Sequence, residues 1–321
     1  MPQLALTNAL TAAIRPYVKA KAIDQVYGNI RAWNYIKRIS GVHETVGGDL
    51  ELHFRIIHRR LDKARFIATP DEEINIAPVD AVRTMAFDWT EEVISIPLTD
   101  LTDFGPTAGA GDLAIINKAK GEVDLALPDM AFLIGNLLYT GGANPGEPIG
   151  IDTIVANTGA YGALSRVLFP VLNATVQAVG GAATLADLHT NTLAATFGNR
   201  EPDLFLTDST LFVSAVSVIQ DAYRYTPSDV EGDVTGKGRP AIVLGRHMIW
   251  DEPVTAGDVI GFNLSGFHVQ VHKSYNMVVE DFIQAPRQPT AYHQPIKWMG
   301  RFAHEEPRVN FKMTGVTGFT T

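Results

Sequence analysis

NTGAYGALSRVLFP, residues 157–170, is a glycine-rich turn that follows the longest helical pattern of the chain. A turn of this kind can hold a phosphate or a nucleophile, or it can join two parts of a fold. Ser165 lies outside any Gly-x-Ser-x-Gly nucleophile elbow, as does Ser265 in NLSGF, so we interpret both as ordinary turn serines. The meaning of the stretch therefore depends on the elements on either side of it.

The elements before the turn begin with an arm and a flap. Residues 8–39 show short helical patterns broken by a proline and a glycine, which predicts an extended arm. Apolar and polar residues alternate over 50–56, 85–89 and 94–98, as half-buried strands require, and a charged segment separates the first two. This pattern predicts a long two-stranded flap with a polar tip. Because an isolated hairpin is marginal in water, we expect a neighbouring subunit to order it.

A long helix is predicted between the flap and the turn. Apolar residues recur at a spacing near 3.6 over 107–140, and Gly141 provides a stop. Pro128 lies inside this run, so we expect the helix to bend or divide there.

The elements after the turn mix helices and strands. Residues 184–198 read as a helix with Thr184 and Asp187 as capping candidates, 202–207 as a buried strand, and 209–225 as an apolar helix. Several strands follow toward the end of the chain. No regular strand-helix-strand repeat is present, so the predicted class is α+β.

The composition is that of a folded globular protein. The chain has 321 residues, of which 46% are hydrophobic and 19% are charged. It has no cysteine, which excludes disulfides and sulfur-ligated metal sites. The start resembles no secretory signal, and the most apolar run, 130–139, is shorter than the ~20 residues of a spanning helix. We therefore expect a soluble, intracellular protein without membrane contact.

Charge is distributed unevenly along the chain. The net charge of −9 argues against a nucleic-acid reader. Residues 1–65 hold 11 Lys and Arg against 5 Asp and Glu, whereas the remainder holds 15 against 30. This asymmetry has two interpretations: scattered solvated charge, or a basic arm that lies on the acidic body of a neighbouring copy.

Three groups of residues could carry chemistry, and each is better explained without it. The glycines at 109–111 lack the third glycine and the preceding strand of a dinucleotide site. His268 and His272 would lie ~13 Å apart on a strand, too far to share one metal ion. The acidic clusters at 71–73 and 305–306 lie in expected turns rather than in a pocket. The sequence therefore predicts no catalytic, cofactor or metal site.

The opening stretch is also similar to a segment of a known family. TGAYGALSR, residues 158–166, resembles the Gly-Thr-Tyr-Gly-Gly-Ile-Asp-Arg segment that follows the long helix in one group of tailed-bacteriophage major capsid proteins. The matching residues are Gly159, Tyr161, Gly162 and Arg166, and the departures are Ala163, Leu164 and Ser165. The resemblance continues, in the same order, in DAVRTMAFDW (80–89), TLADL (184–188), EPDLFLT (201–207), AYRY (222–225), FNL (262–264) and PRVNFKMTGV (307–316).

The resemblance implies the Hong Kong 97-type capsid fold. It implies an N-terminal arm at 1–45, an extended loop at 46–98, a peripheral domain at 99–149 and 286–321 with the spine helix, and an axial domain at 150–285. The polar loop at 226–238 would then surround the centre of each capsomer. In this interpretation the glycines of the opening stretch shape the link between spine helix and axial domain and hold no ligand.

The implied function is that of a major capsid protein, not of an enzyme. Such subunits form pentamers and hexamers of an icosahedral shell around double-stranded DNA, which they hold without sequence-specific contacts. The resemblance further implies a virion protein assembled in the host cytoplasm, with a portal as partner and a decoration protein as a candidate partner. Since no long segment precedes the arm, we expect either a separate scaffolding protein or none. Two alternatives remain: an encapsulin-like nanocompartment shell with protein cargo, or a soluble enzyme with an unrecognised site.

Some residues are candidates for contacts between subunits. Arg60, Arg65 and Trp89 are candidates in the extended loop, since Arg and aromatic residues often anchor interfaces. Some members of the family crosslink a loop lysine to a peripheral asparagine, which makes Lys63 and Asn310 the candidate pair here. Nothing in the sequence supplies the buried carboxylate that would activate such a lysine.

Overall fold

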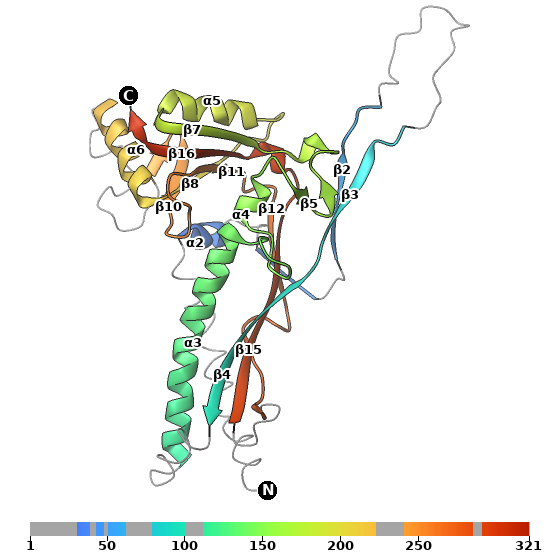
Figure 1. Ribbon diagram of the computed structural model, residues 1–321, viewed down its shortest axis with the longest axis vertical. Helices are drawn as coiled ribbons and strands as arrows, with labels where there is room; N and C mark the ends of the chain where they lie inside the picture. Colours follow the sequence, from blue (N-terminus) through green and yellow to red (C-terminus); the bar gives the residue numbers. More distant parts are fainter. Residues whose placement is uncertain are drawn as a thin grey trace, which may run out of the picture.

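A computed structural model describes residues 31–38, 43–47, 51–61, 79–99, 112–222, 241–284 and 291–320 of the chain. A long helix and a long pair of strands form an extended leg (Figure 1). Another sheet, which helices cover, lies above the leg, and a narrow hairpin projects on the side away from those helices. No helix within the described ranges has both the length and the apolar content to cross a membrane.

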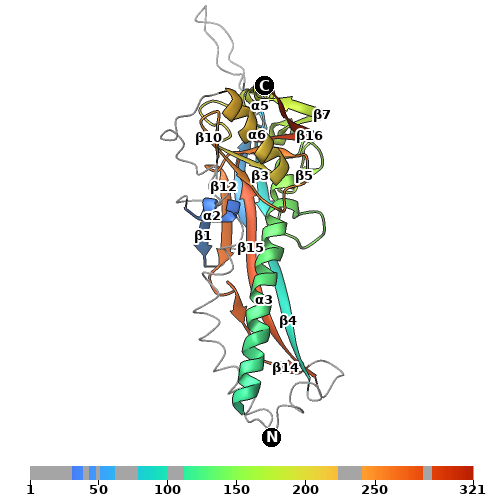
Figure 2. The same cartoon turned by 90° about the vertical axis from the view of Figure 1, so that its left-hand side faces the viewer.

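The leg is built on helix α3, Asp112–Thr140. Its buried side is apolar, and the helix runs alongside strands β4 and β15 (Figure 2). The helix continues through Pro128 without dividing, so of the two expected effects, a bend or a division, the division does not occur. Pro128 lies on the exposed side of the helix, where a backbone carbonyl freed by the proline can bond to water. Past the helix end, the chain turns at Gly142, whose φ of 88° favours glycine.

The long sheet forms the rest of the leg. Its main pairing is antiparallel, between β4, Thr90–Thr99, and β15, Ala291–His304. The paired residues run from Thr90 opposite Gly300 to Thr99 opposite Ala291. The other strands of this sheet pair with β15 or with its neighbour: β12 (Phe267–His272), β13 (Val278–Val279), β14 (Ile283–Gln284) and β1 (His43–Val46). The apolar residues of this sheet and of α3 share one large core with Trp298 at 0% exposure.

The helix-covered sheet has the order β7-β16-β11-β8-β10-β9. Its strands are β7 (Thr175–Thr184), β8 (Leu204–Thr207), β9 (Ala241–Val243), β10 (Arg246–Trp250), β11 (Val259–Phe262) and β16 (Phe311–Thr320). Helices α5 (Leu185–Ala195) and α6 (Ser209–Ala222) share a core with one face of this sheet. In β8, Phe205 belongs to that core, while Leu204 and Leu206 belong to the large core on the other face. Burial of both faces explains why this strand is a continuous apolar run.

Local signals in the sequence account for several element ends. Thr184 caps α5, because its hydroxyl accepts a hydrogen bond from the Asp187 amide at 3.1 Å. Asp187 returns the contact through its carboxylate, which accepts from the Thr184 amide at 2.8 Å. This reciprocal capping box confirms the predicted start of the helix.

The projecting hairpin consists of β2, Leu52–Ile57, and β3, Val82–Phe87. The two strands pair only with each other among the described residues, with Leu52 opposite Phe87. The predicted flap is thus confirmed at its root, while its expected tip lies outside the described residues. The same holds for most of the expected arm and for the loop at 226–238.

The described end of the arm docks on the body through α2, Arg31–Arg38. The carboxylate of Asp251 accepts hydrogen bonds from the Ala32 amide at 3.0 Å and from the Tyr139 hydroxyl at 2.9 Å. One buried carboxylate therefore ties the start of α2 to the end of the long helix.

The strands after residue 259 are divided between the two large sheets, while the expected domain boundary at residue 286 stays a prediction. Strand β16 pairs with β7 and β11 of the helix-covered sheet, and β12 pairs with β15 of the leg. The reason is the burial of Phe311 and Met313 in the core below α5 and α6. The last two long strands thus belong to different sheets.

Candidate functional site

The glycine-rich turn lies where the hairpin, the segment that follows the long helix and the end of β15 meet, and we call this place the junction. Strands β5, Ala160–Tyr161, and β6, Leu164–Ser165, form a short hairpin around Gly162, which has a φ of 55°. A Cβ atom at Gly162 would lie 2.6 Å from the Cβ atom of Met85 in β3. The Gly162 carbonyl accepts a hydrogen bond from the Ala86 amide at 3.2 Å. Only glycine fits this close approach, so the turn fastens the root of the projecting hairpin.

Tyr161 connects the turn to the end of β15. Its side chain is buried, and its hydroxyl donates a hydrogen bond to the His304 carbonyl at 2.9 Å and accepts one from the His304 amide at 2.7 Å. Burial raises the pKa of Tyr161 well above its ordinary value. The hydroxyl therefore stays protonated and serves both backbone groups of His304.

Arg166 connects the turn to helix α4, Ile151–Ile154, which follows the long helix. The guanidinium is fully buried, and its Nη2 atom donates to the Thr153 carbonyl at 2.7 Å and to the Ile154 carbonyl at 3.0 Å. Burial lowers the pKa of Arg166, while proximity to Tyr161 raises it. A cation at the carbonyl end of a helix satisfies acceptors that lack an intrahelical partner.

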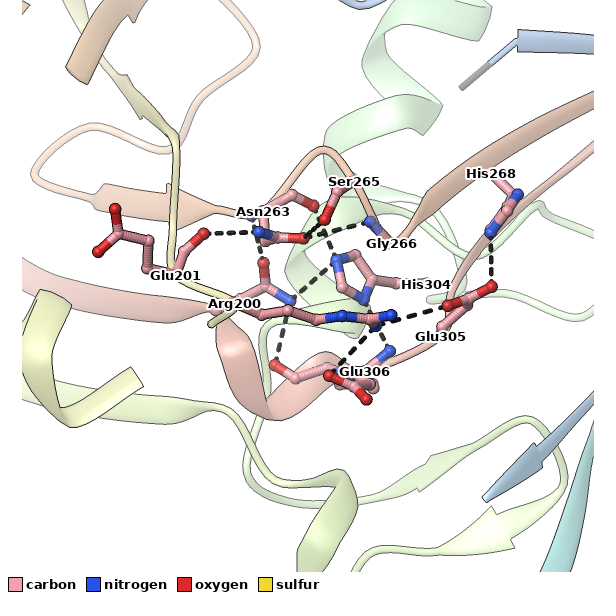
Figure 3. A network of polar contacts seen from close by, with 11 residues as sticks. Arg200, Glu201, Asn263, Ser265, Gly266, His268, His304, Glu305 and Glu306 are labelled. Carbon is pink, nitrogen blue, oxygen red and sulfur yellow. Dashed lines mark hydrogen bonds and ion pairs between the residues drawn. The ribbon is translucent and has the colours of Figure 1, made fainter. Parts of the chain in front are cut away.

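His304 forms the centre of a polar network beside the junction (Figure 3). Its Nδ1 atom accepts a hydrogen bond from the Glu306 amide at 3.0 Å, which leaves Nε2 to donate to the Asn263 carbonyl at 2.8 Å. The ring is fully buried, and burial lowers the pKa of His304 to about 4. At neutral pH the imidazole is therefore uncharged.

Asn310 and Asn263 complete this network. The Asn310 side-chain oxygen accepts from the Asn263 amide at 2.7 Å, and its nitrogen donates to the Pro307 carbonyl at 3.1 Å. The Asn263 side chain in turn accepts from the Ser265 hydroxyl at 2.7 Å. Asn310 is fully buried and its amide is engaged at both atoms, so this geometry is unfavourable for the candidate crosslink to Lys63, which lies outside the described residues.

The acidic pair and the histidines have structural partners. Arg200 lies 3.6 Å from Glu305 and 3.3 Å from Glu306, and His268 lies 3.1 Å from Glu305 (Figure 3). The His272 ring packs against other aromatic rings. Across the described ranges, no group of three or more His, Cys, Asp or Glu residues is placed to hold a metal ion. The polar network thus joins several loops, and its members Arg200, Glu305 and Glu306 also line a groove on the surface.

A groove of about 780 Å³ runs beside the junction, between β2, the turn at 197–200 and two 3-10 helices. These short helices are η2, Pro170–Leu172, and η3, Pro307–Val309. Arg55, Arg59 and Arg60 line the groove from the hairpin side, and all three are exposed. The structure thus places the candidate residue Arg60 in a groove wall.

The other candidate contact residues have different positions. Trp89 is half-buried against its own chain, where the Arg301 guanidinium lies 4.2 Å from its ring centre and the His272 ring packs at 5.5 Å. Arg65 lies outside the described residues. The contacts of Trp89 and Arg65 with a neighbouring subunit therefore stay predictions.

Sequence reasoning missed His304 and Asn263 as members of the junction. His304 stands in a segment that reads as an ordinary strand, and Asn263 stands in FNL, a short motif that carries only the family resemblance. The signal that could have pointed to them is a polar residue at an inward position of a buried strand, since buried polar groups are nearly always hydrogen-bonded.

Comparisons with known proteins give matches in structure only. No family model matches the sequence, and no curated protein matches it either. The fold is similar to that of the holo-SrpI encapsulin complex from Synechococcus elongatus PCC 7942, with a TM-score of 0.56, 11% identity and 89% of both chains covered.

Two phage structures are similar to the same extent. A chain of the cyanophage A-1(L) capsid asymmetric unit has a TM-score of 0.55 and 12% identity, with 88% of this chain and 90% of that chain covered. The capsid of Myoviridae phage XM1 has a TM-score of 0.52 and 10% identity, with 86% and 89% covered. The capsid fold expected from the resemblance is therefore confirmed, and it extends over most of the chain.

Proposed function

We propose that this protein is the major capsid subunit of a tailed phage. The observation that carries the proposal is the hairpin of β2 and β3. Ile57 is 72% exposed, and Val82 opposite it is exposed as well, and neither strand pairs with a third strand within the described part of the chain. Apolar side chains on a projecting hairpin favour contact with a second surface, and a neighbouring subunit would supply it.

The fold supports a shell. Structures with this fold include two phage capsids. We infer that this chain forms pentamers and hexamers of an icosahedral shell around double-stranded DNA. The net charge of −9 gives the chain no overall attraction for DNA phosphates, so the proposed shell would enclose the DNA without depending on tight contacts to it. A virion location, assembly in the host cytoplasm and a portal partner are parts of the same proposal.

An encapsulin-like nanocompartment is the second candidate, because an encapsulin is among the structures of similar fold. The two functions differ in what the particle holds. A capsid would contain nucleic acid, whereas a nanocompartment would contain a cargo protein.

Electron microscopy of the purified full chain tests the proposal, with absorbance at 260 and 280 nm measured on the same fraction. We expect closed shells or capsomer rings, produced alone or with co-expressed neighbouring genes. Shells that carry protein cargo and no nucleic acid would favour the nanocompartment. A small oligomer under every one of these conditions would refute a shell function.

A further inference from the structure

The groove beside the junction has more positive than negative side chains in its walls. Among the residues that the structure describes, two carboxylates and five guanidinium groups line it: Glu305, Glu306, Arg55, Arg59, Arg60, Arg200 and Arg308. The whole chain, in contrast, has a net charge of −9. The groove is therefore a place where a chain of negative net charge attracts anions.

The two carboxylates of the groove do not compensate its whole charge. Arg200 lies 3.6 Å from Glu305 and 3.3 Å from Glu306, so one arginine contacts both acids (Figure 3). His268 contacts Glu305 from the other side at 3.1 Å. The acidic wall thus has cationic partners of its own, and the hairpin wall keeps its charge.

The hairpin wall carries three arginines in a row. Arg55 belongs to β2, and Arg59 and Arg60 follow the end of that strand. All three are exposed, and none has a carboxylate partner within the described ranges. The Cα atoms of Arg55 and Arg59 lie at most ~14 Å apart, since four residues separate them. One strand of DNA places about four phosphates along this length, at ~3.4 Å of helix axis each.

The rest of the groove is largely apolar. Phe197 lines it at 50% exposure, and the Arg308 guanidinium lies 3.6 Å from the centre of its ring. Val171 of η2 and Pro307 of η3 line the same space. Grooves that bind nucleic-acid strands combine cations along the backbone with aromatic side chains beside the bases. A ligand with a row of anionic groups on a less polar frame matches this lining.

We propose that the groove binds the phosphodiester backbone of nucleic acid, with Arg55, Arg59 and Arg60 facing neighbouring phosphates. This inference rests on the proposed shell function, in which the enclosed DNA supplies the backbone, and it assigns residues that touch that DNA. A volume of about 780 Å³ does not enclose a duplex, so one strand of the duplex lies along the groove. Contacts to phosphates alone do not depend on the base sequence.

The salt dependence of DNA binding by the unassembled full-length chain tests the proposal. The probe is a fluorescently labelled duplex of about 30 bp, whose anisotropy gives the dissociation constant between roughly 50 and 200 mM salt. Three neutralised phosphates predict a slope of about −2.7 for log affinity against log salt concentration. The affinity should therefore fall about 40-fold over this range. A second duplex of different sequence should bind equally tightly.

Neutral and charge-conserving variants locate the binding site. The triple variant Arg55→Gln, Arg59→Gln and Arg60→Gln should bind the duplex at least ~10-fold more weakly at low salt and lose most of the slope. The corresponding triple Lys variant should keep the slope, because a phosphate accepts either cation. The matched control is Arg83→Gln on β3, which pairs with Asp80 and lies outside the groove lining, and it should bind as the wild type does. Unchanged urea midpoints verify that each variant folds.

Two further probes distinguish what supplies the anions. A duplex that binds more tightly than a single strand of equal length supports packaged DNA as the source. A single strand that binds more tightly, and loses its affinity in the triple Gln variant, supports the groove with a single-stranded nucleic acid as its ligand. Binding of poly-glutamate without binding of either nucleic acid would assign the groove to an acidic protein and overturn the inference.

The outcomes separate this inference from the shell function. DNA-filled shells from the wild type, together with equal DNA affinities of the wild type and the triple Gln variant, would overturn the inference and leave the shell function standing. Arginine-dependent DNA binding by a chain that forms no shell or ring, even with its gene neighbours present, would refute the shell function and support the ligand class of the groove.

Discussion

The buried His304 should make the folded subunit sensitive to acid. Its ring is fully buried, and burial lowers its pKa from 6.5 to about 4. The unfolded chain therefore binds a proton at this residue more readily than the folded chain does. The stabilising contribution is complete above pH 6.5 and is lost as the pH falls toward 4. The full difference corresponds to about 3 kcal/mol, of which about 2 kcal/mol should be lost between pH 7.5 and pH 5.

Other buried groups act in the opposite direction, so the effect must be isolated. Burial raises the pKa values of Asp203, Asp251 and Asp258, which means that acid stabilises the fold at these sites. The comparison is therefore between the wild type and His304→Gln, whose amide can still donate to the Asn263 carbonyl and does not titrate. Only the difference between their pH profiles reports on His304.

The assay is urea unfolding of the unassembled subunit at pH values from 7.5 to 5, followed by tryptophan fluorescence, since Trp298 is buried. We expect the free energies of unfolding of wild type and His304→Gln to converge by about 2 kcal/mol as the pH falls to 5. His189→Gln, on the exposed side of α5, controls for the loss of a histidine as such. Parallel pH profiles for wild type and His304→Gln would refute the reasoning.

Three further predictions concern the junction and the helix that follows it. Gly162→Ala should destabilise the subunit by about 2 kcal/mol or more, because the new Cβ would meet Met85 and the residue has a positive φ. Gly159→Ala, which also has a positive φ but open space around it, should cost about 1 kcal/mol. The urea concentrations at the unfolding midpoints of the two variants would be compared. Tyr161→Phe removes the hydroxyl that binds the buried amide and carbonyl of His304, and should cost about 1–3 kcal/mol in the same assay. An unchanged urea midpoint would contradict these two contacts. Thr184→Ala removes the capping box of α5 and should lower the free energy of unfolding by about 1 kcal/mol, which thermal unfolding would measure. A cost as large as that of Gly162→Ala would show that Thr184 has a role beyond capping.

Several features of the fold follow from local sequence. The alternation of apolar residues predicted the strands that became β2, β3 and β4, because a strand with one buried face repeats every two residues. The capping residues Thr184 and Asp187 predicted the start of α5, because their hydrogen bonds reach only three residues along the chain. The resemblance of short motifs in a constant order predicted the capsid fold, which the structural comparisons confirm.

Other features depend on contacts between distant segments. Pro128 lies inside an undivided helix, although its local effect predicts a bend or a division, because the packing of the whole helix outweighs one lost hydrogen bond. The closing strand β16 joins the sheet of β7 and β11 rather than that of β15, because its apolar residues fill the core below α5 and α6.

The junction shows the division most clearly. The sequence alone determined that residues 157–170 form a tight, glycine-rich turn, since the glycines allow backbone angles that other residues avoid. Only the tertiary structure decided that Gly162 faces β3 and that Tyr161 and His304, separated by 143 residues, share two hydrogen bonds. Local sequence limits which backbone shapes are accessible, whereas the partner of a buried polar group is determined by which distant segment the packing brings within hydrogen-bond distance.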